Sequence, residues 1–278
     1  MFLKGTVDDM QAAIGFIGAG NLAEALIRGL RDAGVDGGQI VATNRSRRER
    51  LAYLREVWGI ATTPDKGEVS AAADVLVLAM KPADLDQAMR DLQPHITDRH
   101  LVISLLAGVR CASVERYMGE RPTPVIRAMP NLSAAVLAST TALAYGRHAS
   151  PERRTVARAL FDRVGDTVEV SEDVMDAVTA VAGSGPAYVY LFMEALIEAG
   201  VQAGLPADAA RDLAIQTVFG AAKLVKETAA DPADLRRRVT SPGGTTNAAL
   251  TVLEARGFKL AIADAVRQAI RRARELDR

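Results

Sequence analysis

The sequence predicts an α/β protein of two domains, with an N-terminal doubly wound sheet over residues 1–170 and an all-helical domain over residues 171–278. The first observation is that short apolar runs alternate with stretches of helical spacing as far as Val170. The second is that strand-like runs stop at Ser171 while helical spacing continues to the C-terminus. Residues 1–11 lack an apolar core of the signal-peptide kind, and we expect them to form a weakly ordered lead-in.

The strands of the first domain are predicted from apolar runs of four to six residues. Their composition is typical of strands buried on both faces of a parallel sheet. The runs are 12–17, 39–43, 75–79, 101–104, 125–129, 142–145 and 167–170. Helical spacing separates many of them, at 24–30, 85–92, 113–118 and 151–164. In such a sheet ligands bind at the carboxyl ends of the strands, so the loops after these runs should border a ligand site.

A glycine-rich turn follows the first predicted strand directly. Gly18, Gly20 and Ala23 give the pattern G-x-G-x-x-A between a strand and a helix. Glycines at these positions allow a tight turn and a close approach of the backbone to a pyrophosphate, which lies at the helix N-terminus. The pattern in this context predicts a Rossmann-type dinucleotide-binding domain.

The end of the second predicted strand indicates which dinucleotide binds. An NAD site usually places an acidic residue there, but this chain has Asn44-Arg45-Ser46-Arg47-Arg48 and no acid before Glu49. Arginine offers a planar, permanently charged fork to a phosphate. We therefore expect NADPH as the cofactor, with NADH as the alternative, although the same residues could simply begin a helix with Ser46 as its N-cap.

Composition excludes several classes of partner. The chain has 34 basic and 34 acidic residues, so its formal net charge is zero, which argues against a general nucleic-acid or membrane-surface binder. No uninterrupted apolar run is long enough for a membrane helix. Cys111 is the only cysteine, which suits a cytoplasmic protein, and the three histidines show no metal-ligand spacing.

The helical domain contains one polar, glycine-rich turn, Thr240-Ser241-Pro242-Gly243-Gly244-Thr245-Thr246. A Gly-Gly turn at the first turn of a helix can align several N–H groups, which together seat a carboxylate or a phosphate. The alternative is an ordinary N-cap after a turn. Upstream, Ala182–Pro186 should break one helix and start another, which is so broadly apolar that a second subunit is its expected cover.

Three motifs in order make the chain resemble the pyrroline-5-carboxylate reductase family. They are Gly18-Ala19-Gly20-Asn21, Ala182-Gly183-Ser184-Gly185-Pro186-Ala187-Tyr188 and Ser241-Pro242-Gly243-Gly244-Thr245-Thr246, and the likeness runs from Ile14 to Leu276. The resemblance implies reduction of the cyclic imine 1-pyrroline-5-carboxylate to L-proline with NAD(P)H, the last step of proline biosynthesis. It also implies a homodimer formed through the helical domain, and often a decamer.

The resemblance implies site residues as well. Those for the cofactor are Ile17, Gly18, Ala19, Gly20, Asn21, Leu22, Asn44, Ser46, Ala79, Met80, Lys81, Pro82, Leu105, Leu106 and Ala107, to which the charge argument above adds Arg45. Those for the substrate, a small anionic cyclic imine, are Glu172, Ser241, Gly243, Gly244, Thr245 and Thr246. Thr246 is expected to hydrogen-bond the ring nitrogen and is the predicted catalytic residue.

Two departures from the family pattern leave alternatives open. The family usually has Met-Pro-Asn-Thr-Pro where this chain has Met129-Pro130-Asn131-Leu132-Ser133, and Asp65-Lys66 stands where an asparagine is frequent. One alternative is an oxidoreductase for another cyclic imine or a 3-hydroxy acid, for which Lys223 would be the candidate base. The other is a non-catalytic nucleotide-binding paralogue.

Overall fold

The computed structural model describes residues 12–276, so the predicted lead-in over 1–11 lies outside the described residues. Internal contacts divide the chain into two compact units. The first contains the described residues up to Ser184 and those from Ala269 onward, and the second is Gly185–Gln268. The division differs from the boundary after residue 170 that the sequence predicts, and each unit is described by itself.

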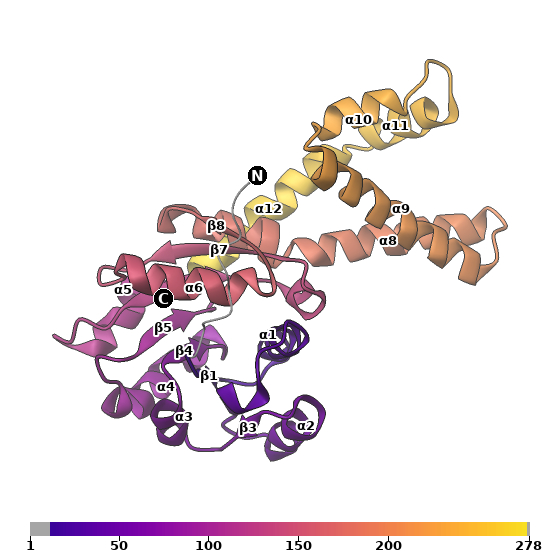
Figure 1. Ribbon diagram of the computed structural model, residues 1–278. Coiled ribbons are helices and arrows are strands. Elements are labelled where there is room, and N and C mark those ends of the chain that lie inside the picture. The colour runs from indigo at the N-terminus through magenta and orange to yellow at the C-terminus, as the bar shows by residue number, and fades with distance from the viewer. Residues whose placement is uncertain (1–11, 277–278) are drawn as a thin grey trace. The chain divides into compact units, whose positions relative to one another are not determined.

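The first unit is built on one eight-stranded sheet in the order β3-β2-β1-β4-β5-β6-β7-β8 (Figure 1). The first six strands run parallel in the order 3-2-1-4-5-6 of dinucleotide-binding folds, which confirms the predicted fold class. The strands are β1 (Ile14–Ile17), β2 (Ile40–Thr43), β3 (Ala61–Thr62), β4 (Val75–Leu78), β5 (Leu101–Ser104), β6 (Val125–Met129), β7 (Ser139–Tyr145) and β8 (Gly165–Glu169).

The last two strands depart from the parallel pattern for a reason of connection length. β7 runs antiparallel to β6, because only the short 3-10 segment Leu132–Val136 joins them, and a parallel return needs a crossover of a dozen or more residues. The helix α6 (Pro151–Asp162) provides such a crossover, and β8 accordingly runs parallel to β7. The two-residue strand β3 has no apolar run, and the sequence did not predict it.

Helices pack on the two faces of the sheet and enclose separate hydrophobic cores. Residues of β1, β4 and β5 point alternately into the two cores, and every residue of these strands is buried. The helices of this unit are α1 (Asn21–Asp32), α2 (Arg48–Trp58), α3 (Lys66–Ala72), α4 (Leu85–Leu92), α5 (Cys111–Glu115), α6 and α7 (Met175–Val178), with shorter 3-10 turns between them.

The segment after β8 belongs to the sheet unit because specific contacts hold it there. The Arg127 side chain, buried in β6, donates to the Asp176 carboxylate at 3.0 Å, and Met175 is fully buried. Asn131 donates from its amide nitrogen to the Ala182 carbonyl at 3.0 Å. These bonds explain why the contact division falls at Ser184, beyond the last strand.

The predicted helix break at Ala182–Pro186 is confined to Ser184, where the chain bends. Residues Thr179–Gly183 wind as a π-helix, in which the Ser184 N–H donates to the Thr179 carbonyl at 2.8 Å, and α8 (Gly185–Gln202) follows at once. Pro186 lies in the first turn of α8, where a missing N–H costs no helical bond. The break is therefore shorter than predicted, and the new helix starts one residue before Pro186.

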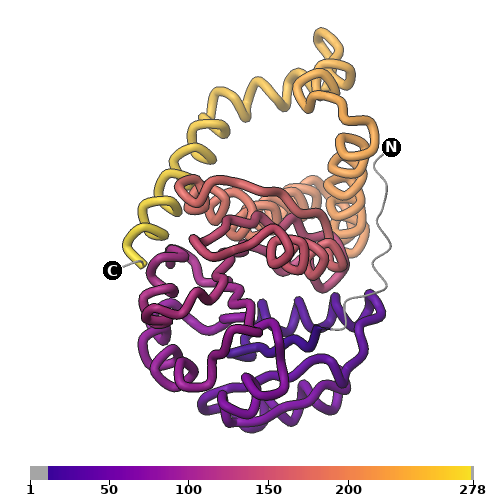
Figure 2. The backbone as a smooth tube through the Cα atoms, turned by 60° about the vertical axis from the view of Figure 1, so that its left-hand side comes forward, coloured from indigo at the N-terminus to yellow at the C-terminus, as the bar shows by residue number. Residues whose placement is uncertain are grey.

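The second unit is entirely helical, as predicted. Helices α8 and α9 (Ala207–Thr228) pack side by side in both backbone views (Figures 1 and 2). α10 (Pro232–Arg238), α11 (Thr245–Ala255) and α12 (Phe258–Glu275) follow, and α10 was not predicted. The residues of α12 from Ala269 onward belong to the first unit. Phe192 of α8 and Phe258 of α12 meet with their ring centroids 6.4 Å apart.

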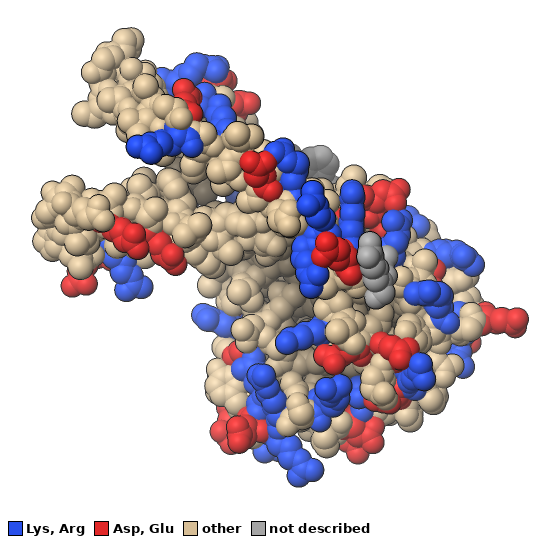
Figure 3. All heavy atoms as spheres, turned by 180° about the vertical axis from the view of Figure 1, so that it is seen from behind, with Lys and Arg blue, Asp and Glu red and all other residues tan. Residues whose placement is uncertain are grey.

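The helical unit leaves much apolar surface uncovered in the single chain. No residue of α8 is buried, and long uncharged stretches cover these helices (Figure 3). Leu191, Leu213, Phe219 and Leu260 are all more than half exposed. The continuous stretch Glu172–Gln202 even has the length and hydropathy of a membrane span, a property the sequence analysis did not anticipate. An exposed apolar surface of this size is typical of a site that another protein chain or a membrane covers.

Candidate functional site

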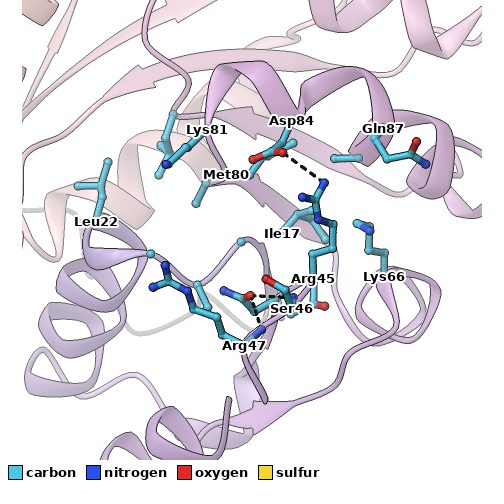
Figure 4. A pocket seen from close by; sticks show the side chains of 18 of the residues that line it. Ile17, Leu22, Arg45, Ser46, Arg47, Lys66, Met80, Lys81, Asp84 and Gln87 are labelled. Carbon is cyan, nitrogen blue, oxygen red and sulfur yellow. Dashed lines mark hydrogen bonds and ion pairs between the residues drawn. The ribbon is translucent and has the colours of Figure 1, made fainter. Parts of the chain in front are cut away.

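A cavity of about 460 Å³ lies at the carboxyl ends of β1, β2, β4 and β5 in the first unit (Figure 4). It is the edge of the sheet where doubly wound folds bind their ligands. The residues that line it are Ile17, Gly18, Ala19, Gly20, Asn21, Leu22, Thr43, Asn44, Arg45, Ser46, Arg47, Lys66, Ala79, Met80, Lys81, Asp84, Gln87, Ala88 and Leu105. Most of the residues predicted for the cofactor are therefore brought together.

The glycine turn between β1 and α1 requires its first glycine. Gly18 has φ +110°, and a Cβ there would lie 2.7 Å from the Met80 nitrogen and 2.8 Å from the Ala79 carbonyl carbon. The Gly18 N–H donates to the Thr43 carbonyl at 3.1 Å. The turn is thus pressed between the ends of β2 and β4, and a side chain would push these strand ends apart.

The start of α1 presents free backbone donors to the cavity. Gly20 is its N-cap and has no side chain to satisfy the first N–H groups of the helix. A Cβ added at Gly20 would meet nothing within 4 Å, so the space before the helix is open. Asn21 and Leu22, the first two helical residues, line the same cavity. Open N–H groups at a helix start are suited to a pyrophosphate.

Arg50 of α2 holds the glycine turn from behind. Its Nε donates to the Ala19 carbonyl at 2.9 Å, and its Nη2 donates to the Glu24 carboxylate at 2.5 Å. Trp58 also donates to Glu24, at 3.4 Å. Burial raises the pKa of Glu24, but the hydrogen bonds from Arg50 and its other neighbours outweigh burial and hold that pKa below its ordinary value. The sequence analysis did not single out these residues.

The loop after β2 is ordered by Asn44. Its side-chain oxygen accepts from the Ser46 N–H at 3.2 Å and from the Arg47 N–H at 3.1 Å. Arg47, and not Ser46, is the N-cap of α2, so the alternative that Ser46 caps this helix is wrong. The side chains of Arg45 and Arg47 remain at the cavity, where Arg45 Nη1 lies 3.3 Å from an oxygen of Asp84 (Figure 4).

Three of the predicted cofactor residues do not line the cavity. Leu106 is 1% exposed and packs in the core on one face of the sheet, while Ala107 packs against Met129 and its neighbours. Pro82 begins a 3-10 turn beside the cavity. Conversely, Asp84, Gln87 and Ala88 line the cavity but were not predicted, although their i, i+3, i+4 spacing after a strand could have revealed one helix face at the site.

The second unit carries the predicted carboxylate seat. Gly243 has φ +72°, and Gly244 is the N-cap of α11 without a side-chain cap. A Cβ at Gly244 would lie 2.4 Å from Ser241 Oγ, so a side chain there would force the Ser241 hydroxyl to move. Thr245 and Thr246 open the helix, and their N–H groups have no partner within it. The turn thus has the geometry of an anion site, and its role stays a prediction.

Glu172, the remaining predicted substrate residue, lies in the first unit. Its carboxylate accepts from the Cys111 N–H at 2.6 Å, and the guanidinium of Arg110 lies 3.8 Å away. Burial, followed by the Glu172 charge, raises the pKa of the Cys111 thiol strongly. The thiol is therefore held protonated, in accord with a structural cysteine, and Glu172 has a structural contact whatever its role toward substrate.

Comparison with known proteins identifies both parts of the chain. A family profile described as pyrroline-5-carboxylate reductase dimerisation matches residues 172–276. A second, described as NADP oxidoreductase coenzyme F420-dependent, matches residues 13–108. The second match covers the glycine turn and the cavity, and the first covers the exposed helices.

Relatives match over almost the entire chain. Pyrroline-5-carboxylate reductase of Synechocystis is 44% identical over 96% of this chain and 99% of its own. Pyrroline-5-carboxylate reductase 2 of Bacillus subtilis is 40% identical over 95% of this chain and 94% of its own.

Solved structures agree with these relatives. The reductase from Coxiella burnetii superposes with a TM-score of 0.86 at 38% identity, over 96% of this chain and 99% of that one. Pyrroline carboxylate reductase of Plasmodium falciparum with NADP bound gives 0.88 at 26% identity, over 96% and 99%. The chain belongs to the pyrroline-5-carboxylate reductase family.

Proposed function

We propose that this protein reduces 1-pyrroline-5-carboxylate to L-proline with NADPH, the last step of proline biosynthesis. The observation that carries the proposal is a cavity with the glycine turn at one end and arginines at the other, in a chain of this family. A relative of the same fold was solved with NADP bound. The reaction needs one hydride and one proton per substrate molecule.

The residues of the cavity fit a phosphorylated dinucleotide. The open N–H groups of α1 would hold the pyrophosphate, since Gly20 leaves the space before them clear. Asn44, Arg45, Ser46 and Arg47 would hold the 2′-phosphate, with Arg47 free to turn toward it because its side chain has no protein partner among the described residues. NADH lacks this phosphate, so it should bind more weakly.

The substrate seat is proposed at the start of α11. Its unpaired N–H groups, with Ser241 beside them, would hold the carboxylate of the imine, and Thr246 would hydrogen-bond the ring nitrogen. When bound, NADPH supplies a hydride to C5 of the ring, and the protonated nitrogen becomes the amine of proline. The protein's main contribution is then to hold the nicotinamide and the imine close together in the reactive orientation. Such positioning can lower the activation barrier by up to about 7–11 kcal/mol.

The direct test is to mix purified protein with NADPH and pyrroline-5-carboxylate and follow the loss of reduced-nicotinamide absorbance. A six-membered cyclic imine and a 3-hydroxy acid with NADP are the comparison substrates. Preferential turnover of pyrroline-5-carboxylate supports the proposal. Preference for either other substrate selects the rival oxidoreductase, and nucleotide binding without any turnover selects the non-catalytic paralogue.

The roles of single residues can be tested separately. Thr246→Ala should lower kcat and leave NADPH binding unchanged, whereas Thr251→Ala on the same helix should alter neither, because Thr251 Oγ1 only donates to the Asn247 carbonyl. Replacing Arg45 and Arg47 by Ala should raise the KM for NADPH and leave that for NADH nearly unchanged. Equal changes for both cofactors would contradict the 2′-phosphate assignment.

Two structural features bear on the alternative functions, which are a 3-hydroxy-acid dehydrogenase and a non-catalytic paralogue. Lys223, the candidate base of a 3-hydroxy-acid dehydrogenase, lies on α9 with its Nζ 3.7 Å from the Glu227 carboxylate, and this charge pairing does not suit a neutral base. The altered loop after Asn131 is well formed, because the Asn131 side chain caps its 3-10 turn by accepting from the Ser133 N–H at 2.9 Å. The departure from the family pattern thus leaves an ordered loop.

The proposed assembly is a homodimer in which the helical unit of one chain covers that of another, with a decamer as the larger state the resemblance allows. The uncovered faces of α8, α9 and α12 support it. We assign the protein to the cytoplasm, with no nucleic-acid or membrane partner, since the apolar stretch Glu172–Gln202 lies within the dimerisation match. Sedimentation of the detergent-free protein tests the proposed homodimer, and a stable monomer would refute it.

A further inference from the structure

Asp84 is the one acidic residue among the described residues that line the nucleotide cavity. It lies at the end of the loop after β4 and is the N-cap of α4. Its carboxylate faces Arg45, which reaches across from the end of β2, with 3.3 Å between Arg45 Nη1 and Asp84 Oδ1 (Figure 4). An acidic side chain thus stands beside the cation assigned to a phosphate.

The local conformation of Asp84 is unusual for its position. Aspartate at an N-cap ordinarily accepts a hydrogen bond from the first turn of its own helix. The Asp84 side chain makes no such cap bond and turns toward Arg45 instead. Asp84 ends the 3-10 turn Pro82–Asp84, which runs directly into α4, and the Leu85 N–H already donates to the Pro82 carbonyl. The Asp84 carboxylate is therefore directed to Arg45 and not to the start of the helix.

The pair itself is easily exchanged. The side chains of Arg45 and Asp84 are 68% and 41% exposed, and pairs this accessible to water contribute little net stability. The neighbouring cation, Lys66, is held by Asp91 at 2.8 Å, but Asp91 does not line the cavity. Asp84 is accordingly the carboxylate that an incoming phosphate beside Arg45 would meet.

We propose that Asp84 is a specificity-determining residue that lowers the preference for NADPH over NADH by competing with the 2′-phosphate for Arg45. The inference rests on the proposed use of NADPH. In the free protein Asp84 holds Arg45 across the cavity. When a 2′-phosphate takes Arg45, the Asp84 carboxylate loses its cation and remains as one negative charge near another.

Asp84→Asn is a clean variant, because asparagine keeps the size of the side chain and removes only its charge. Affinity is measured by calorimetry with 2′,5′-ADP and with 5′-AMP, a pair that differs by the 2′-phosphate alone, and then with NADPH and NADH. We expect the variant to bind 2′,5′-ADP and NADPH about two- to fivefold more tightly at low salt, with 5′-AMP and NADH unchanged.

Asp86→Asn is the matched control. Asp86 lies two residues further on, pairs with Arg90 at 3.1 Å and accepts from Tyr117 at 3.0 Å, and does not line the cavity. The Asp86→Asn variant also removes one negative charge near the start of α4, and it should leave the affinities for 2′,5′-ADP, 5′-AMP, NADPH and NADH unchanged. An equal effect of both variants would assign the change to net charge and overturn the proposal.

A second background separates the pairing from other effects. In an Arg45→Ala protein, Asp84→Asn should improve 2′,5′-ADP binding clearly less than it does beside Arg45, since there is no cation to release. An undiminished gain there, or unchanged or weaker NADPH binding in the single variant, overturns the inference.

The outcomes also distinguish this inference from the proposed function. A wild-type protein that does not prefer 2′,5′-ADP to 5′-AMP would remove the NADPH assignment, and this inference with it. A wild-type preference that Asp84→Asn leaves unaltered would remove the role of Asp84 alone.

Discussion

Replacing Arg50 by methionine tests how the glycine turn is held. The variant keeps the apolar stem but loses the bonds to the Ala19 carbonyl and the Glu24 carboxylate. Exposed ion pairs contribute about 0–1 kcal/mol, and breaking a buried pair costs about 3–5 kcal/mol. The Arg50 and Glu24 side chains are 20% and 22% exposed, between these limits. We therefore expect a loss of about 2 kcal/mol of unfolding free energy.

That loss should lower the thermal midpoint by about 4–8 °C, since 1 kcal/mol shifts a domain of this size by about 2–4 °C. Arg50 does not line the cavity, so its effect on binding must pass through the turn. We expect the Kd for NADPH and for NADH to rise by the same factor, because both carry the pyrophosphate that the turn receives.

Arg55→Met is the control, because Arg55 is an exposed residue of the same helix without a side-chain partner among the described residues. It should change the midpoint by less than about 2 °C and leave both Kd values alone. If Arg50→Met loses stability but binds both cofactors normally, Arg50 is only a strut for α2. If only NADPH binding weakens, the 2′-phosphate site extends further than we assign it.

Three other outcomes follow from the structure. Gly18→Ala should abolish binding of both cofactors in equilibrium dialysis, because the new Cβ meets the Met80 nitrogen at 2.7 Å, and normal binding would contradict the close approach. Since the folded pKa of Glu24 is lowered, its charge stabilises the fold above its ordinary pKa of 4.5, and this is lost as pH falls through the lower folded value. Glu24→Gln should thus flatten the acid limb of the stability–pH profile, and an unchanged limb would refute the pairing. Cys111, buried and with a raised pKa, should resist iodoacetamide until the protein unfolds, and rapid native labelling would contradict its burial.

The sheet could be predicted because its central strands are buried on both faces, and their sequences are therefore continuous apolar runs. β4 and β5 are clear examples, since every residue of each is apolar or buried. β3 could not be found this way, because two residues at the sheet edge, one exposed and one half-buried, need no apolar pattern. The π-helix that extends to Gly183 could not be predicted either, because glycine usually breaks a helix and a π turn leaves no separate sequence pattern.

The cofactor site could be predicted where it depends on the backbone. Gly18 is required by its close approach to Met80, and Gly20 leaves the start of α1 open, and both features can be read from residue type. Contacts between distant segments could not be predicted, because nothing in the sequence near Arg45 indicates that Asp84 will face it. The same holds for Arg50, whose partners lie 26 to 31 positions earlier.

A crystal structure of the protein with NADP and proline bound would test both proposed ligand sites at once. The account predicts the 2′-phosphate beside Arg45 and Arg47, and the carboxylate of proline at the N–H groups that follow Gly243 and Gly244. A proline carboxylate bound anywhere other than the start of α11 would contradict the proposed substrate seat, and with it the division of labour between the two units.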